Sequence, residues 1–321
     1  MMKNNSNEHR ENLYAHAKIA VTIPCYNEAV TIAKVVRDFT AILPQATIHV
    51  FDNNSEDGSA DLAREVGAHV HHVRKQGKGH VMRAIFDSID ADVLVVVDGD
   101  DTYYAEDALR LIEPILNGEA DMVIGNRLQS ATDASMSRLH QFGNLLIVKT
   151  INLMFKTNYK DVLSGYRVVS RRFVKNVPVL TTGFEIETEL TLQALEREAE
   201  IIEIPVSYRR RPEGSESKLR SFHDGHRIIM TAAIILRDHK PIRLFGLISL
   251  ICFLFTGISS ILRILNYLSI TSLPNELLTG TIMILSPLGI VSLSIGLILS
   301  AVNTRLRELN QIFDRNRKSE L

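Results

Sequence analysis

Two aspartates separated by one glycine come directly after the apolar run VLVVV. Asp98-Gly99-Asp100 therefore sits where a buried strand is expected to end. Carboxylates at positions i and i+2 can bind one hard cation, and a glycine between them lets the backbone approach closely. Bound Mg²⁺ or Mn²⁺ would connect the carboxylates to a substrate diphosphate and neutralise charge on that group as it leaves. An acidic turn that only caps the next helix has the same appearance, and Asp101 fits either interpretation.

Short β-branched runs alternate with segments of helical spacing around these aspartates. Strands are predicted at 18–23, 47–52, 68–73, 91–98 and 121–127, and helices at 29–42, 60–66 and 78–89. This alternation predicts right-handed crossovers and a mostly parallel sheet with helices on both faces. Ligands of such sheets bind beyond the carboxyl ends of the strands. We therefore expect the polar segments 24–28, 52–55, 98–100 and 125–127 to meet at one edge.

Two long apolar runs, 241–262 and 277–302, follow the predicted sheet domain. Each exceeds the roughly 20 residues that a helix needs to cross a bilayer. Basic residues precede the first run and follow the second, which places both ends in the cytoplasm. The N-terminal segment has no apolar stretch of the kind found in signal peptides. The two cysteines, Cys25 and Cys252, form no disulfide framework, which fits a reducing cytoplasm.

Basic residues gather before the first apolar run. Residues 205–243 contain nine Lys and Arg against four acidic residues, a balance that favours anionic headgroups and phosphates. The last of these basic residues are explained by anchoring alone. Arg210, Arg211 and Lys218 instead flank a Gly-Ser turn, which suits a clamp that closes on a phosphate. The predicted order is a polar leader at 1–17, a catalytic domain at 18–220, an amphipathic juxtamembrane helix at 221–240, two transmembrane helices at 241–302 and a basic cytoplasmic tail at 303–321.

Seven short motifs occur in the order found in family 2 glycosyltransferases with the GT-A fold. They are IPCYNE, FDNNSEDGS, QGKGH, VVVDGDD, GNR, DVLSGYR and RPEGSESKL. More narrowly, the chain resembles polyprenyl-phosphate glycosyltransferases such as dolichol-phosphate mannose synthases and undecaprenyl-phosphate sugar transferases. The resemblance covers residues 19–243 by motif and extends to the anchor by architecture. It implies metal-dependent, inverting transfer of a hexose-type sugar from a UDP- or GDP-sugar to a polyprenyl phosphate at the cytoplasmic membrane face.

The resemblance also implies roles for individual residues. The donor is bound by Pro24, Tyr26, Glu28, Phe51, Asp52, Asn53, Lys78, Asp98, Gly99, Asp100, Arg211 and Lys218. Asp98 and Asp100 hold the metal and form the catalytic group together with Arg127, while the acceptor phosphate meets Arg127, Ser164, Arg167 and Arg210. Asn53 stands where the family usually has a second acid. The spacing of the last motif leaves Arg210 and Arg211 as alternatives for the diphosphate contact.

Three further features have simpler interpretations. A lipid phosphate is already an anion and needs little proton abstraction, so Glu187 is expected to orient other groups rather than act as a general base. His69, His71 and His72 have no acidic or cysteine partner at ligand spacing and are interpreted as surface strand residues. If the DVLSGYR segment is a plain turn, Arg167 is exposed.

Two other functions remain open. A family 2 transferase that acts on a polysaccharide or lipid hydroxyl would need a firm general base. A non-catalytic membrane subunit would use a degenerate transferase domain for assembly only. The net charge of −1 gives no argument for nucleic acid. Assembly of copies through the anchors is compatible with the resemblance.

Overall fold

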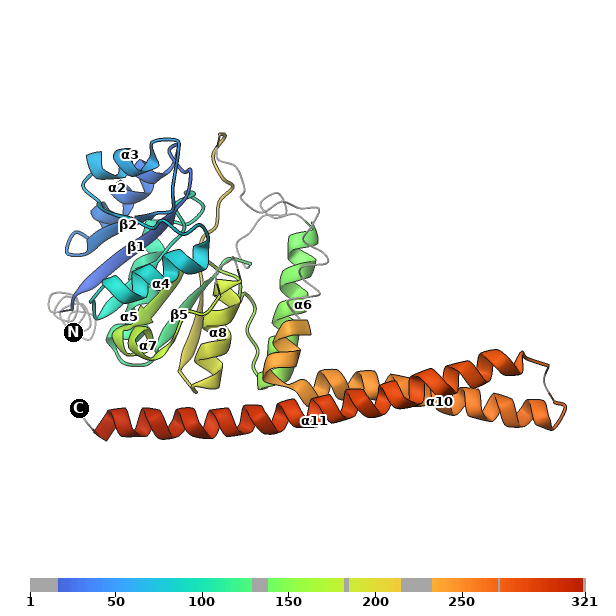
Figure 1. Ribbon diagram of the computed structural model, residues 1–321. Helices are drawn as coiled ribbons and strands as arrows, with labels where there is room; N and C mark the ends of the chain where they lie inside the picture. The colour runs from blue at the N-terminus through green and yellow to red at the C-terminus, as the bar shows by residue number, and fades with distance from the viewer. Residues whose placement is uncertain (1–16, 129–137, 182–184, 215–232, 271, 320–321) are drawn as a thin grey trace, which may run out of the picture. The chain divides into compact units, whose positions relative to one another are not determined.

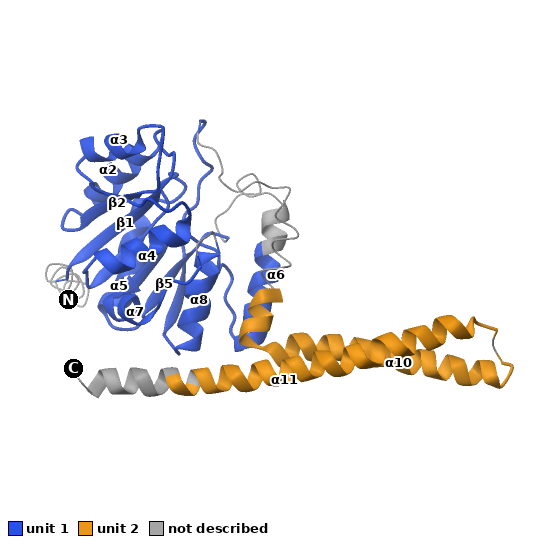
Figure 2. Cartoon of the chain, viewed as in Figure 1, with its two compact units in different colours: residues 1–225 blue, residues 226–321 orange. Residues whose placement is uncertain are grey.

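The chain forms two compact units, Met1–Gly225 and His226–Leu321, shown together in Figure 1 and in separate colours in Figure 2. The computed structural model describes residues 17–128, 138–181, 185–214, 233–270 and 272–319. The predicted domain boundaries at 220, 240 and 302 stay a prediction. Residues 1–16 of the predicted leader lie outside the described part.

A seven-stranded sheet forms the centre of the first unit, with the order β3-β2-β1-β4-β6-β5-β7. Among these strands β6 alone runs antiparallel to its neighbours, β4 and β5. The predicted α/β class is confirmed, and β6 makes the sheet mixed. The strands are β1 (Ile19–Cys25), β2 (Thr47–Asp52), β3 (His69–His72), β4 (Val93–Val96), β5 (Met122–Asn126), β6 (Arg167–Ser170) and β7 (Ile201–Pro205).

Helices pack on both faces of this sheet. One core cluster joins the sheet to α2 (Ile32–Ile42), α3 (Ser59–Glu65) and α5 (Ala108–Leu116). The other core cluster joins it to α4 (Lys78–Ser88), α7 (Arg171–Asn176) and α8 (Ile186–Glu196). On α2 the buried residues are Ile32, Val35, Val36 and Phe39, the one-sided spacing of an amphipathic helix. The short η1 (Ala105–Asp107) precedes α5, and α6 (Arg138–Phe155) precedes β6.

β1 continues two residues beyond its predicted end and includes Pro24. Val97 donates its backbone N–H to the carbonyl of Thr22, so the polar backbone groups of Thr22 face β4. Residues two apart in a strand point the same way, so the nitrogen of Pro24 faces that side as well. β4 pairs with β1 only from Ile19 to Thr22. Proline is tolerated here because β4 has already ended.

The direction of β6 decides which segments meet at the functional edge. The carboxyl ends of β1, β2, β4 and β5 lie at one edge, as predicted from their alternation with helices. Because β6 runs the opposite way, its first residue, Arg167, pairs with Val96 near the end of β4 and with Ile124 on β5. The turn at 161–166 therefore reaches the same edge as the two aspartates that follow β4.

The second unit contains two long apolar helices, α10 (Pro241–Tyr267) and α11 (Asn275–Ser319). Spans of 27 and 32 residues within them are long and apolar enough to cross a membrane. Leu254 is 60 % exposed and Leu277 is 68 % exposed, a surface that suits lipid better than water. α11 continues as one helix through most of the predicted tail, and most of the predicted juxtamembrane helix lies outside the described residues.

Candidate active site

The turn after β4 places two carboxylates at the sheet edge in different surroundings. Asp98 is partly exposed, whereas only 4 % of the surface of Asp100 is accessible. Thr102 donates from its backbone N–H and its hydroxyl to Oδ1 of Asp100, at 3.2 and 2.6 Å. The hydroxyl of Thr31 donates to the carbonyl of Gly99 at 2.6 Å and connects this turn to the loop after β1. The aspartate turn is therefore held in place before any ligand binds.

Each carboxylate of this pair has a protein cation beside it. Nζ of Lys78 lies 2.6 Å from Oδ1 of Asp98 and 2.5 Å from Oε1 of Glu187. Arg211 lies 2.6 Å from Oδ2 of Asp100. Burial disfavours any isolated charge here, so these pairs are what keep the site charged. Glu187 is therefore connected to the aspartate pair through Lys78, and its predicted orienting role stays a prediction.

The two aspartates have pKa values that move in opposite directions. Burial pushes the pKa of Asp98 upward, but the charge and hydrogen bond of Lys78 outweigh burial, so this pKa lies below its ordinary value. Burial and the negative charge of Asp98 raise the pKa of Asp100, against the opposing charge of Arg211. The separation therefore comes from the deeper burial of Asp100, the charge of Asp98 beside it and the Lys78 contact of Asp98.

The carboxylates suit a hard divalent cation that also binds a substrate. Within the described residues, no group of three or more His, Cys, Asp or Glu side chains could hold a metal. Asp98 and Asp100 offer oxygen ligands from two residues only, so further ligands would have to come from diphosphate and water. That is the usual way in which proteins bind Mg²⁺ beside a phosphate substrate. The residues present therefore fit the implied Mg²⁺ or Mn²⁺.

Gly165, rather than Gly99, is the glycine on which the site geometry depends. A Cβ added to Gly165 would lie 2.1 Å from Oδ2 and 2.8 Å from Cγ of Asp98. A Cβ on Gly99 would meet Ile23 at 3.3 Å and Ile32 at 3.4 Å, which is tight but close to ordinary contact. The role of Gly99 in letting the backbone approach a cation stays a prediction. The tighter approach to Asp98 comes from Gly165, in the turn before β6.

Arg127 is locked to that same turn. Its Nε donates to Oδ2 of Asp161 at 2.9 Å, and Nη2 donates to the carbonyl of Leu163 at 3.0 Å. Asp161 is completely buried, and its backbone N–H donates to Glu203 at 2.8 Å. The guanidinium of Arg127 also lies 5.8 Å from the centre of the Tyr208 ring. Arg127 is thus oriented from several sides at the end of β5.

Tyr103 is a part of this region that the sequence did not single out. Its hydroxyl accepts the N–H of Gly165 at 3.1 Å and lies 3.4 Å from Oγ of Ser164. Burial raises the pKa of Tyr103 above its ordinary value. Tyr103 also forms an isolated antiparallel bridge with Tyr208. Its position three residues after Asp100 could have indicated from the sequence that Tyr103 lies near the site. Its partner Gly165, however, lies 62 residues farther along the chain.

Arg167 and Ser164 are buried, which corrects one expectation. Only 2 % of Arg167 is exposed, so the interpretation of an exposed residue in a plain turn is wrong. Its guanidinium donates to the carbonyls of Val162 and Ser164 and to the hydroxyl of Thr191. Ser164 is fully buried as well. Both residues shape the turn at 161–166, and their predicted contacts with the acceptor phosphate stay a prediction.

The loops after β1 and β2 form the other side of the edge. Tyr26 is 39 % exposed, and Pro24 is partly buried at the end of β1. The backbone N–H of buried Glu28 donates to Oγ of Ser59 at 2.8 Å. Asp52 accepts the N–H of Ser55 at 3.2 Å and lies 3.2 Å from Nδ1 of His72. These residues lie on the strand ends where nucleotides bind in such sheets.

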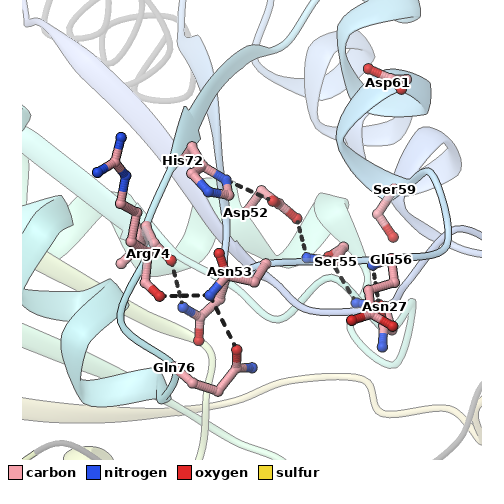
Figure 3. A network of polar contacts seen from close by, with 12 residues as sticks. Asn27, Asp52, Asn53, Ser55, Glu56, Ser59, Asp61, His72, Arg74 and Gln76 are labelled. Carbon is pink, nitrogen blue, oxygen red and sulfur yellow. Dashed lines mark hydrogen bonds and ion pairs between the residues drawn. The ribbon is translucent and has the colours of Figure 1, made fainter.

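Asn53 organises the loop that follows β3, and Figure 3 draws it within the network of polar contacts around Asp52. Its Nδ2 donates to the carbonyls of Val73 and Lys75 at 2.9 and 2.7 Å. Its Oδ1 accepts the N–H of Gly77 at 2.7 Å. A carboxylate could not donate either of the first two bonds. An amide in place of the family's second acid therefore holds the segment that leads into Lys78, and the predicted contact of Asn53 with the base stays a prediction.

Of the three histidines of β3, His69 and His72 are exposed, and His71 alone departs from the expected surface position. The ring of His71 stacks on Phe51 with centroids 4.4 Å apart, and its Nε2 lies 3.0 Å from Nδ1 of His49. His71 is half-buried, so its interpretation as a surface residue is wrong, while His69 is exposed as expected. Phe51 is 1 % exposed. Its predicted contact with the donor stays a prediction.

Arg211, and not Arg210, lies beside the aspartate pair, while the choice between them for the diphosphate contact stays a prediction. Arg211 reaches Asp100, while Arg210 is exposed and Arg209 pairs with Asp101. Lys218 lies outside the described residues. Asp101 caps no helix, because the first residue before η1 is Tyr104 and no side chain caps that helix. The capping interpretation of Asp101 is therefore wrong.

Comparisons with known proteins agree with this geometry. The family model for glycosyl transferase family 2 matches residues 20–177. Glycosyltransferase AglJ of Haloferax volcanii is 34 % identical over 229 residues, which cover 71 % of this chain and 75 % of the relative. Dolichyl-phosphate hexose transferase of the same organism is 28 % identical, covering 66 % and 91 %.

A crystal structure shares the fold. Glucosyl-3-phosphoglycerate synthase from Mycobacterium tuberculosis, in complex with Mn²⁺, UDP and glucosyl-3-phosphoglycerate, superposes with a TM-score of 0.59 at 20 % identity. The match covers 71 % of this chain and 81 % of that one. The sheet, the aspartate turn and these matches together identify the chain as a glycosyltransferase of family 2, related to polyprenyl-phosphate sugar transferases.

Proposed function

We propose that this enzyme transfers a hexose-type sugar from a UDP- or GDP-sugar to a polyprenyl phosphate, with inversion at the sugar carbon. The observation that carries the proposal is the aspartate pair at the sheet edge, with a cation beside each carboxylate and Arg127 held nearby. Two helices long enough to cross a membrane follow this domain in the same chain. We place the catalytic domain, residues 18–220, at the cytoplasmic face, anchored by residues 241–302.

The donor side is assigned to the loops after β1, β2 and β4. Mg²⁺ or Mn²⁺ held by Asp98 and Asp100 would neutralise charge on the departing diphosphate. Arg211 is beside Asp100 in the free enzyme and supplies a second positive charge to that diphosphate. Lys78 pairs with both Asp98 and Glu187 and fixes their positions before the donor binds. Pro24, Tyr26, Glu28 and Asp52 line the nucleoside side.

The acceptor side is assigned to Arg127 and the exposed Arg210. Asp161 and Leu163 orient the guanidinium of Arg127, so little freedom is lost when it binds a phosphate. Ser164 and Arg167 act from beneath by shaping the turn. A phosphate attacks as an anion and needs no general base. The 2.5 Å pair of Glu187 with Lys78 agrees with this, because it engages the Glu187 carboxylate with a protein cation.

The test is a panel of UDP- and GDP-sugars incubated with a short polyprenyl phosphate and Mn²⁺, followed by mass spectrometry of the lipid. We expect one sugar to be transferred by the wild type and none by Asp100→Ala at any Mn²⁺ concentration. Asp61→Ala serves as the control, because Asp61 is exposed and, among the described residues, its ion pair is with Arg64 on the same helix, α3. Full activity of Asp100→Ala would overturn the mechanism. Transfer to a hydroxyl acceptor, lost in Glu187→Gln, would replace it with the alternative reaction.

A further inference from the structure

Asp101 follows the metal pair but faces a different set of partners. It is 5 % exposed and has a left-handed backbone, with φ of 58°. Its Oδ1 accepts from Nζ of Lys34 at 3.0 Å and is also paired with Arg209. A buried carboxylate with two cations is satisfied where it is. Asp101 is therefore neither a helix cap nor a third metal ligand in this structure.

Arg209 connects Asp101 to a distant segment of the chain. Its Nε donates to the carbonyl of Asp101 at 2.6 Å, and its backbone N–H donates to the carbonyl of Thr102 at 2.9 Å. Its guanidinium lies 4.4 Å from the centre of the Tyr104 ring. The bridge between Tyr103 and Tyr208 continues the same pairing. Residues 208–209 are thus fastened to residues 101–104 by backbone and side chain together.

Arg211 stands two residues beyond this fastening. It contacts Asp100, the residue next to Asp101. Arg209 and Arg211 therefore pair with consecutive aspartates. Arg209 makes a fixed contact with Asp101, whereas Arg211 contacts Asp100 at the catalytic turn. Only Arg210 separates Arg209 from Arg211, so a displacement of the backbone at Arg209 also displaces Arg211.

We propose that Asp101 is a positioning residue that acts through Arg209 to hold Arg211 at the diphosphate position. The ion pair fixes residues 208–211 against the catalytic turn, and Arg211 then exchanges Asp100 for the donor diphosphate. The second half of this statement rests on the proposed function, whereas the first half does not. Two measurements on the full chain in detergent separate these halves.

The first measurement is hydrogen exchange in the ligand-free protein. Asp101→Asn removes one charge but keeps the size and the tolerance of a left-handed backbone. We expect peptides that contain the Arg209 amide to exchange about tenfold faster in this variant, since a charged contact that protects them is lost. Asp38→Asn is the matched control, because exposed Asp38 shares Lys34 and lies 4.0 Å from Arg209. Unchanged exchange in Asp101→Asn would overturn the fastening.

The second measurement is a double-mutant cycle on nucleotide binding by calorimetry. UDP and GDP are titrated with Mn²⁺ present, and the tighter of the two is used for all variants. We expect Asp101→Asn to weaken binding about tenfold in the wild type. If Asp101 acts through Arg211, the same change has no further effect in Arg211→Ala. Equal effects in both backgrounds would overturn the positioning role.

A wild type that binds neither nucleotide would refute the proposed function instead. The exchange measurement would still decide whether Asp101 fastens the Arg209 segment. A variant that fails to fold would show exchange increases throughout the domain. In that case Arg209→Lys, which keeps the charge but loses the fork of donors, supplies the decision, with faster exchange expected at the same peptides and unchanged exchange refuting the fastening.

Discussion

Adding one methyl group at Gly165 is the sharpest test of the site geometry. The new Cβ would lie 2.1 Å from Oδ2 of Asp98, whereas real Cβ atoms essentially never approach a heavy atom within 3.0 Å. The Asp98 carboxylate or the turn must therefore move by at least about 0.9 Å, the difference between these two distances. A shift of the carboxylate disturbs the 2.6 Å contact between Asp98 and Lys78, whereas a shift of the turn displaces the Leu163 carbonyl that holds Arg127. The methyl group thus acts on a proposed metal ligand without touching its chemistry.

The expected effect on catalysis follows from the size of this movement. A misplacement of about 1 Å in a catalytic site costs on the order of 100-fold in rate. We expect kcat/KM of Gly165→Ala to fall by about that factor, which corresponds to about 2.7 kcal/mol of transition-state stabilisation. The Mn²⁺ concentration needed for half-maximal transfer should rise as well. Both quantities come from sugar transfer measured over a range of Mn²⁺ concentrations.

Gly99→Ala is the matched control, since Gly99 lies between the two aspartates. Its added Cβ would be 3.3 Å from Ile23 and 3.4 Å from Ile32, and both neighbours are side-chain atoms. We expect a cost in stability of about 1 kcal/mol and a loss of kcat/KM below about fivefold. If Gly165→Ala retained wild-type kcat/KM and Mn²⁺ dependence, the reasoning that places Asp98 against the turn would be refuted.

Two further predictions concern the nucleotide side of the sheet. Asn53→Asp removes two donated hydrogen bonds and leaves a carboxylate facing the carbonyls of Val73 and Lys75, so the free energy of unfolding should fall by about 2–4 kcal/mol. We expect a lower thermal midpoint and faster proteolysis within residues 73–77. An unchanged midpoint would contradict the role assigned to Asn53. Burial and the charges of His71 and His69 lower the pKa of His49 to about 4, below the value of about 6.5 expected for the unfolded chain. The unfolded chain then binds more protons, so stability should fall as the pH drops from about 6.5 to 4. His49→Gln should make the thermal midpoint depend less on pH in this range. The same pH dependence in wild type and variant would argue against this role of His49.

Local periodicity was sufficient for the elements that position the site. β2 begins and ends where its alternation predicts, at Thr47 and Asp52. The buried stripe of α2 is the one that its spacing indicates. These signals reside in neighbouring residues, so they survive without any knowledge of the fold. The same holds for the aspartates, because a strand end can be recognised from the apolar run before it.

Features that depend on chain direction were not accessible in this way. A short apolar strand such as β6 carries no local sign of whether it runs parallel or antiparallel. Its reversal brings the 161–166 turn to the aspartates, buries Arg167 and makes Gly165 the point of close contact. Periodicity could therefore indicate a turn here but not what the turn would meet.

The aspartates themselves illustrate the remaining gap. Asp98, Asp100 and Asp101 are alike in sequence, yet their counter-ions come from two separate segments. Lys78 at the start of α4 pairs with Asp98, and the segment after β7 supplies Arg211 for Asp100 and Arg209 for Asp101. Only the contacts across as many as 108 residues distinguish a carboxylate that can exchange its cation from one whose cation is fixed. Arg211, the partner of Asp100, lies toward the exposed end of the segment after β7. Arg209, the partner of Asp101, is also held by its backbone hydrogen bond to Thr102. Under the proposed function, donor binding would displace Arg211 from Asp100 while the segment that carries Arg211 stays fastened through Arg209.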